Sequence, residues 1–204
     1  MTFPKIWVDA RDNPAVFTPR PIKPPRTSFV NLVAALNAVQ VEDHGYQSVQ
    51  NFITQFGLQK ARVFFIGNGG SAAVAMHMAT DWQKNAKFAT FGPGDSSLMS
   101  CYGNVYGFDH VYSEQIERHG QLGDVLFAIS SSGMSENILR AVDCAKQKMM
   151  NVVTLSGFGE GNFLRKKGQV NFYVPSNYYG TVEITHLAIL HSILDEVIAN
   201  EATK

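Results

Sequence analysis

Residues 62–71 read Arg-Val-Phe-Phe-Ile-Gly-Asn-Gly-Gly-Ser, and this stretch decides the fold. Its first half is a short run of bulky apolar residues, which is typical of a buried strand in a parallel sheet. The glycines that follow allow a sharp turn and a close approach of the backbone to a ligand. Residues 72–79 then supply strong helix formers. A strand, a glycine-rich turn and a helix in this order leave free N–H groups at a helix N-terminus, which bind anions and above all phosphate.

Three kinds of phosphate site compete for this turn. Gly67, Gly69 and Ala72 satisfy the loose dinucleotide pattern G-x-G-x-x-G/A. A dinucleotide site also needs an acidic residue at the tip of the second strand, but glycine and proline follow the predicted strand 87–91, which argues against a nucleotide. A Walker-type loop is excluded because Gly-Lys-Ser/Thr is absent. A phosphosugar site remains, beside the alternative of a tight turn without a ligand.

A second loop, residues 130–135, reads Ser-Ser-Ser-Gly-Met-Ser and supports the phosphosugar site. It follows the apolar run 124–129 and precedes a predicted helix at 136–142, for which Ser135 is a suitable N-cap. Clustered hydroxyls beside free N–H groups hold a phosphate without a lysine, although an ordinary serine-rich turn is the alternative. In an open parallel sheet both loops lie at the carboxyl edge, where ligands bind.

The rest of the chain alternates strands with helices, which predicts an α/β fold: a three-layer, open parallel five-stranded sheet with helices on both faces. The predicted strands are 62–66, 87–91, 124–129, 150–155 and 170–174. The predicted helices outside this alternation are two N-terminal ones, 27–39 and 44–56, and a last one at 182–199. An insert at 95–119 is expected to hold an active-site loop at 102–107 and a helix near 110–118.

Composition narrows the function classes. The chain has 204 residues, and its 17 basic residues balance 17 acidic ones, so no electrostatic argument favours nucleic acid or a membrane surface as a partner. The isolated Cys101 and Cys144 fit a reducing compartment better than a disulfide scaffold. No apolar signal core or membrane-spanning run is present, and we expect a cytoplasmic protein.

Residues 1–26 form a proline-rich, extended arm before a single domain at 27–204. Six of the eight prolines lie in this arm, and proline fixes φ and removes backbone donors. Apolar residues such as Trp7 and Phe17 indicate that the arm packs on something, for instance a neighbouring subunit; a loose tail is the alternative.

Two pairs of side chains are candidates for chemistry. His77 and Asp81 are four residues apart and share a helix face, and Glu183 and His191 are eight apart on the last helix. Two histidines and two carboxylates suit acid/base catalysis or a metal. His77 taken alone is more typical of a structural helix histidine.

These motifs together resemble a SIS (sugar isomerase) domain of the phosphoheptose isomerase type, over about residues 28–198. The resemblance rests on the two loops, on His77, and on Tyr-Gly-Asn at 102–104 and Gly-Asp-Val-Leu at 123–126. It implies a flavodoxin-like fold and conversion of sedoheptulose 7-phosphate to D-glycero-D-manno-heptose 7-phosphate through an enediol, for lipopolysaccharide or capsule heptose. It also implies a homotetramer with sites at subunit boundaries, and zinc in some members.

Carried over residue by residue, the resemblance makes Asp81 and His191 the catalytic pair. The implied metal ligands are His77, Asp81, Glu183 and His191. The implied substrate- and phosphate-binding residues are Asn68, Gly69, Ser71, Asn104, Ser130, Ser131, Ser132 and Ser135.

The chain departs from the family pattern at several positions. Asp81 stands where the family has glutamate, and Glu183 where it has glutamine; both keep an oxygen ligand. Val105 replaces an aspartate, and Gly180 and Thr181 replace an Asp-Arg pair. These changes leave the phosphate-binding residues intact and alter those expected to contact the sugar. A non-catalytic phosphosugar- or protein-binding module is therefore the alternative to an isomerase.

Overall fold

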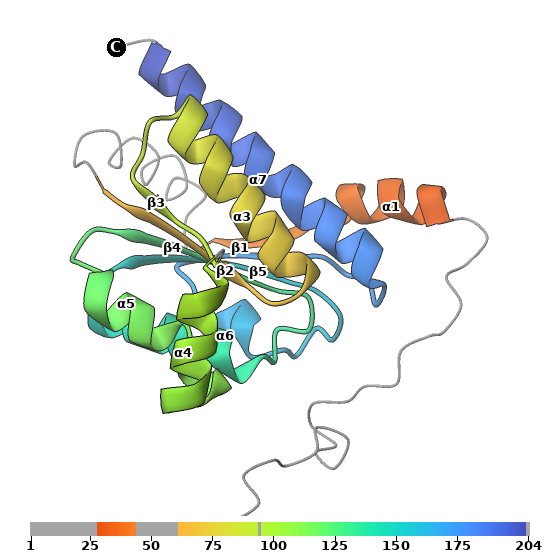
Figure 1. The fold of residues 1–204 in the computed structure, drawn as a ribbon. Coiled ribbons are helices and arrows are strands. Elements are labelled where there is room, and N and C mark those ends of the chain that lie inside the picture. The colour runs from red at the N-terminus through yellow and green to blue at the C-terminus, as the bar shows by residue number, and fades with distance from the viewer. Residues whose placement is uncertain (1–27, 44–60, 94, 203–204) are drawn as a thin grey trace, which may run out of the picture.

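The computed structural model describes residues 28–43, 61–93 and 95–202, which form three layers with a sheet between two layers of helices (Figure 1). The arm at 1–26 and the predicted helix 44–56 lie outside the described residues, and the division of the chain at residue 27 stays a prediction. Among the described helices none is long and apolar enough to cross a membrane.

The described sheet has six strands in the order β1-β6-β5-β4-β2-β3. The strands are β1 (Gln40–Asp43), β2 (Val63–Gly67), β3 (Thr90–Phe91), β4 (Val125–Ser130), β5 (Asn151–Ser156) and β6 (Val170–Tyr173). All neighbours are parallel except β1, which pairs antiparallel with β6. The predicted parallel five-stranded core is confirmed, and β1 is an additional edge strand.

The strand order reverses between β2 and β4. The chain leaves β2 toward β3 at one edge and returns to form β4 on the other side of β2. In open parallel sheets such a reversal opens a crevice at the carboxyl ends of the two strands, because the following loops diverge to opposite faces. The loops at 67–70 and 130–135 are the two that lie beside this reversal.

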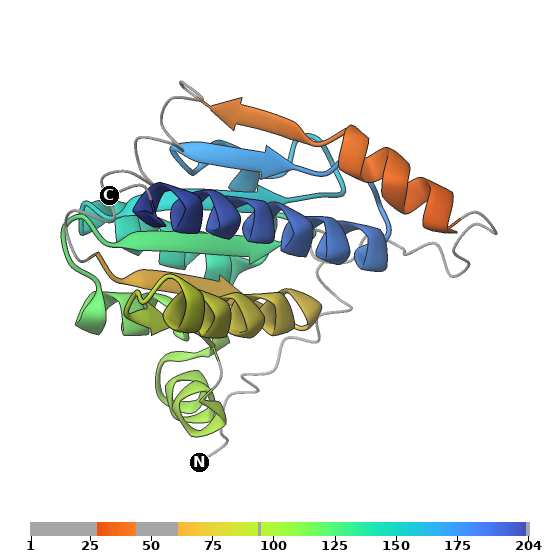
Figure 2. The same cartoon turned by 90° about the horizontal axis from the view of Figure 1, so that it is seen from above.

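One helical layer consists of α1 (Ser28–Asn37), α3 (Gly70–Asn85) and α7 (Tyr179–Ala202), and α3 and α7 run side by side in both views (Figures 1 and 2). Large aromatic side chains fill the space between this layer and the sheet. Phe65 stacks on Phe127 with ring centroids 4.9 Å apart, and the fully buried Trp82 meets Phe65 edge-on. This core fixes α3 and α7 on the sheet.

The other layer consists of α4 (Ser96–Tyr106), α5 (Ser113–His119) and α6 (Glu136–Gln147), with short 3₁₀ turns η2 (Phe108–His110) and η3 (Leu164–Lys166). Its core contains Phe64, Leu126 and Ile138. Adjacent residues of β2 and β4 therefore serve the two opposite cores, as the alternation of side chains along a strand requires.

Two sequence predictions are wrong in this region and at the N-terminus. Residues 102–106, expected as an active-site loop, belong to α4, because Asp95 caps that helix: its carboxylate accepts from the N–H groups of Ser97 at 2.9 Å and Leu98 at 3.0 Å. The first helix ends at Asn37 rather than 39, because the chain turns there into β1.

Candidate active site

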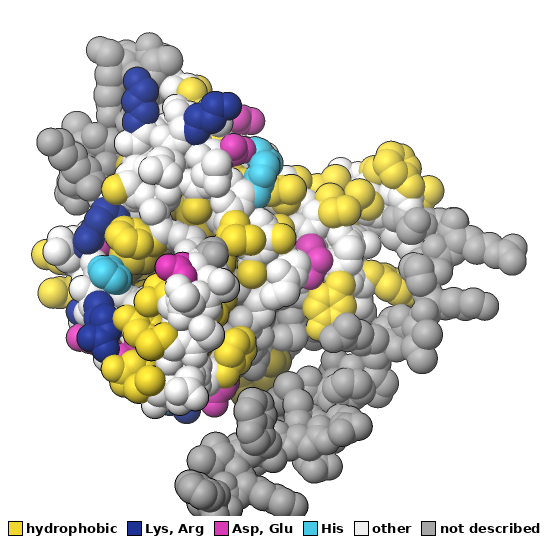
Figure 3. Space-filling view, viewed as in Figure 1, with side chains coloured by type: hydrophobic (Ala, Val, Ile, Leu, Met, Phe, Trp, Pro, Cys, Tyr) yellow, Lys and Arg dark blue, Asp and Glu magenta, His cyan; other side chains and the backbone are white. Residues whose placement is uncertain are grey.

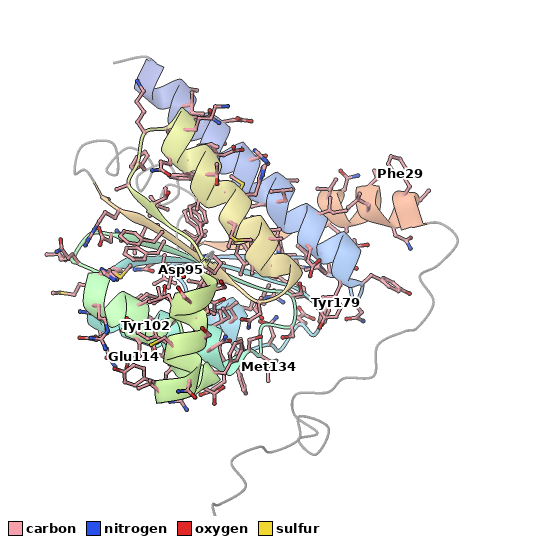
Figure 4. All side chains as sticks on the ribbon, viewed as in Figure 1. Phe29, Asp95, Tyr102, Glu114, Met134 and Tyr179 are labelled. Atoms are coloured by element: carbon pink, nitrogen blue, oxygen red, sulfur yellow. The ribbon has the colours of Figure 1, made fainter. Side chains whose placement is uncertain are left out.

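An open pocket of about 400 Å³ lies at the carboxyl edge of the sheet, at the strand reversal. It is lined by Asn68, Gly69, Gly70, Ser71, Ser130, Ser131, Ser132, Ser135, Tyr179 and Glu183. Both predicted loops therefore contribute to one pocket. Figure 4 shows Tyr179 at the start of α7 and Met134 in the loop before α6, at the same end of the molecule.

Three helices begin at this pocket. Gly70 starts α3, Ser135 is the N-cap of α6, and Tyr179 starts α7. Helix N-termini carry partial positive charge and unpaired N–H groups, so the pocket attracts an anion although none of the described residues lining it is Lys or Arg. Gly69 has φ +56°, a conformation that favours glycine and turns the chain from β2 into α3.

The serine hydroxyls converge on the loop after β4. Ser130 Oγ lies 3.2 Å from Ser135 Oγ and 3.5 Å from Ser132 Oγ. The side chain of Ser135 caps no backbone N–H, and the buried Ser131 Oγ has no hydrogen-bond partner among the described residues. Among the residues that the structure describes, the Ser131 hydroxyl has no partner and the Ser135 hydroxyl has only its contact with Ser130, so both can form a further hydrogen bond to a phosphate oxygen.

Two contacts that the sequence did not predict hold the loop after β2 to residues of the opposite helical layer. The side-chain amides of Asn68 and Asn137 form a reciprocal pair, each Nδ2 donating to the other's Oδ1 at 2.9 Å. The hydroxyl of Tyr112 donates to the carbonyl of Gly67, and burial raises its pKa to about 12, so it stays protonated and keeps donating. The Asn68 side chain thus joins the β2 loop to α6.

Glu183 projects from α7 against the start of α3. A Cβ at Gly70 would overlap the Glu183 carboxylate, so this contact requires glycine at position 70. Burial raises the pKa of Glu183 above its ordinary value. A carboxylate therefore sits within a pocket that otherwise offers N–H and O–H donors. Tyr179, which sequence reasoning missed, lines the pocket one turn earlier on α7 and packs edge-on against Phe158.

A second group of side chains lies farther along the same two helices. His77 Nε2 is 3.1 Å from His191 Nε2 and 3.3 Å from Asp81 Oδ2. One potential ligand atom from each of these three residues lies within 4.8 Å of the other two. His77 and Asp81 come from α3 and His191 from α7, so the side-by-side packing of these helices creates the group.

The helical rise gives the distance between the two regions. Ser71 and His77 are six residues apart, which is about 9 Å along α3, and Glu183 and His191 are eight apart, about 12 Å along α7. The pocket and the three-residue group are therefore about two helical turns apart along the packed helices α3 and α7.

Comparisons with known proteins show which family the chain belongs to. A family model described as SIS domain matches residues 31–157, more than half of the chain. Phosphoheptose isomerase of Aeromonas hydrophila is 36% identical over 188 residues, covering 88% of this chain and 97% of that protein. The enzyme of that name from Vibrio vulnificus is 33% identical over 178 residues, covering 83% and 93%.

The chain belongs to the phosphoheptose isomerase family of SIS-domain proteins. Two solved structures share its fold. A phosphoheptose isomerase from Neisseria gonorrhoeae has a TM-score of 0.67 at 28% identity and covers 84% of this chain and 95% of that chain. One from Francisella tularensis has a TM-score of 0.72 at 24% identity, covering 83% and 92%.

Two residues predicted for the phosphoheptose isomerase site lie apart from their expected companions. Glu183 lines the serine pocket and is not in the group formed by His77, Asp81 and His191. Asn104 is exposed on α4 and does not line the pocket. Their roles as metal ligand and substrate contact stay predictions. His186 is fully buried, its Nε2 lies 3.0 Å from the carbonyl of Ser156, and burial lowers its pKa to about 4, all of which fits a structural histidine.

Proposed function

We propose that this chain is a phosphosugar isomerase that interconverts a ketose phosphate and an aldose phosphate, with sedoheptulose 7-phosphate and D-glycero-D-manno-heptose 7-phosphate as the pair. One observation carries the proposal. An anion pocket whose described lining residues include no Lys or Arg and a histidine–carboxylate group lie on the same two helices, about two turns apart. Such an arrangement suits a substrate whose phosphate and carbonyl lie at opposite ends.

The phosphate binds in the serine pocket. The N–H groups at the starts of α3 and α6 and the hydroxyls of Ser71, Ser130, Ser132 and Ser135 donate to its oxygens. Asn68 and Gly69 shape the first loop, and the partnerless Ser131 hydroxyl supplies a further donor. Since none of the described lining residues is Lys or Arg, no charged side chain of that kind loses its hydration when phosphate binds. The sheet holds the helix termini and hydroxyls in place before the ligand arrives.

Proton transfer takes place at the other end of the substrate. Asp81 accepts the proton from the carbon beside the carbonyl and later returns it to the neighbouring carbon. His191 moves a proton between the two oxygens of the enediol. His77, which contacts both Asp81 and His191, orients them.

A zinc ion fits the same three residues. Two imidazole nitrogens and one carboxylate oxygen within 4.8 Å of one another form a ligand set typical of catalytic zinc, which keeps a position open. When bound there, the metal would polarise the substrate carbonyl. Zinc binding is measured by titration calorimetry on the metal-free chain, and His77→Ala is expected to weaken it while leaving inorganic phosphate binding unchanged.

The assembly we propose is a homotetramer. Phe29 and Val30 on α1 are 76% and 63% exposed, and Val33 and Leu36 on the same helix are also exposed. Figure 3 shows hydrophobic side chains gathered over α1. An apolar helix of this kind is typical of a subunit interface. Light scattering at micromolar concentration is expected to give four chains per particle, and a monomer would contradict the proposal. A cytoplasmic location and a place in surface heptose synthesis stay predictions.

The deciding experiment incubates the purified chain with six- and seven-carbon ketose phosphates. We expect aldose formation, and incorporation of deuterium from heavy water at the carbon beside the carbonyl, followed by NMR. A chain that binds the sugar phosphates and exchanges no proton is a binding module instead, and the isomerase proposal then fails.

A further inference from the structure

A second groove, of about 590 Å³, lies beside α1 and adjoins the serine pocket, because Tyr178 lines the groove and Tyr179 lines the pocket. One wall consists of Asn31, Ala34 and Ala35 on one face of α1 and of Ala38 in the turn after it. The other wall comes from the end of β6 and from the turns that follow β5 and β6. It consists of Phe158, Tyr173, Pro175, Ser176, Asn177 and Tyr178.

The chemistry of this groove is distinctive. Three aromatic rings and a proline face three alanines, whose small side chains let another backbone approach closely. The side chains of Asn31 and Asn177 and the hydroxyl of Tyr178 line the groove and make no hydrogen bond to the described residues. Aromatic-lined grooves with a few unpaired polar groups are the surfaces that bind polyproline II segments.

The chain itself contains such a segment, which the function proposed above does not use. Residues 19–25 read Pro-Arg-Pro-Ile-Lys-Pro-Pro, with a P-x-x-P spacing from Pro21 to Pro24. Four prolines in seven residues favour polyproline II, a conformation that loses little entropy on binding.

The segment also lies close enough in the sequence to reach the groove. It ends three residues before Ser28, where α1 starts. At about 3.1 Å per residue, Pro24 and Pro21 reach about 12 and 22 Å back from Ser28. The groove wall from Asn31 to Ala38 lies about 4.5 to 15 Å from Ser28 along the helix direction. Counted from a turn at residue 26, Pro24 and Pro21 would be about 6 and 16 Å away, which matches the length of this wall.

We propose that residues 19–25 bind in the α1 groove of their own chain, with the prolines on the aromatic rings and the backbone carbonyls accepting from Asn31, Asn177 and Tyr178. The proposal leaves the opposite side of α1 free, because Phe29, Val33 and Leu36 are not part of the groove. The arm thus covers one face of α1 while the other remains available to a second subunit.

Hydrogen exchange of the full chain tests the docking. In Pro21→Ala/Pro24→Ala, we expect amide exchange in segment 174–179 to rise at least about threefold, with exchange in the serine loop 130–135 unchanged. Pro4→Ala/Pro14→Ala is the matched control and should leave both segments as they are. Ala34→Arg, on the exposed wall of the groove, should likewise raise exchange in segment 174–179, whereas Asn37→Arg, which is exposed but does not line the groove, should not. Unchanged exchange in the Pro21/Pro24 variant and in Ala34→Arg overturns the proposal.

Disulfide trapping shows whether the arm in the groove belongs to the same chain or to a second copy of the chain. In a Cys101→Ser background, Lys23→Cys paired with Asn177→Cys should cross-link within one chain under mild oxidation. Lys23→Cys paired with Ser192→Cys, an exposed position on α7, is the control and should not. A cross-link between chains, shown by mass spectrometry on mixed isotope-labelled chains, overturns docking in the same chain and assigns the groove to the arm of a second copy. Equal cross-linking of both pairs overturns a specific site.

Discussion

The serine pocket and the His77–Asp81–His191 group differ in how they are built. The pocket consists mainly of backbone N–H groups and short hydroxyl side chains in two loops, each directly after a buried strand. The group consists of side chains from two helices, and its two histidines, His77 and His191, are 114 residues apart in the sequence. The pocket is fixed by the sheet, whereas the group exists only because α3 packs along α7. Binding and chemistry therefore depend on different parts of the molecule, and substitutions should separate them.

The largest separation of catalysis from phosphate binding is expected from Asp81→Asn. An amide keeps the shape of the side chain and cannot accept a proton, so the rate of isomerisation should fall by about 10²–10⁴-fold, the usual contribution of a general base. The affinity for the sugar phosphate should stay at the wild-type value, because every serine is intact. Steady-state kinetics and calorimetry measure the two quantities on the same preparation.

His191→Ala is the companion variant from the other helix and should behave alike. Loss of phosphate binding in both variants would mean that these residues support the fold rather than the reaction. Full activity in Asp81→Asn would exclude Asp81 as the base and leave Glu183 as the remaining carboxylate.

The converse result is expected from Ser135→Ala. This hydroxyl caps no backbone N–H of α6, so its removal costs the helix little, and the effect should fall on the ligand. Losing one hydrogen bond to a charged phosphate should weaken binding by about 10- to 100-fold. The rate at saturating substrate should stay near wild type, so that KM rises while kcat holds. A drop in kcat with unchanged KM would contradict the assignment of Ser135 to the phosphate.

Glu183→Gln tests whether Glu183 acts in the serine pocket rather than in the His77–Asp81–His191 group. At pH 7 the variant removes a negative charge from an anion pocket and should bind phosphate about tenfold more tightly, or by about 1.4 kcal/mol. Because burial raises the pKa of Glu183, wild-type binding should improve as the pH falls toward that pKa and Glu183 takes up a proton. The ratio of the phosphate affinity of the variant to that of the wild type then approaches one at acidic pH. Phosphate itself also titrates, but this affects both affinities equally and cancels in the ratio.

The same variant tests the predicted metal role of Glu183. If Glu183 belongs only to the pocket, zinc affinity measured by calorimetry should not change. A weaker zinc affinity in Glu183→Gln, with phosphate affinity unaltered, would place this carboxylate with His77 and His191 instead.

The sequence was sufficient for the parts that depend on local pattern. The apolar runs ending in Gly67 and Ser130 predicted two buried strands and a shared binding edge, and the strand–helix alternation predicted the parallel core. Family resemblance supplied the link between His77 and His191, which no local spacing contains.

The rest depended on tertiary contacts that carry no local signal. β1 has four residues without a clear apolar alternation and forms because β6 offers a free edge. Gly103 and Asn104 indicated a turn, but the Asp95 cap and packing against η2 keep α4 helical. The position of Glu183 in the pocket depends on Gly70, since only a residue without a Cβ leaves room there for the Glu183 carboxylate.

The smallest effect is expected from the amide pair that joins the two loops. Asn137 is 2% exposed, and Asn137→Ala leaves the Asn68 amide without its partner, which should lower the free energy of unfolding by about 1–3 kcal/mol. Asn68→Ala should cost a similar amount, and the double variant should cost no more than either single one, because the two bonds are shared. Thermal unfolding measures all three. The rate of isomerisation at saturating substrate should hold, since the pair touches only the pocket end of the molecule, whereas phosphate affinity should weaken as the loops lose their register. Additive costs in the double variant would mean that the two amides act independently, and that the sheet alone holds the β2 and β4 loops in place.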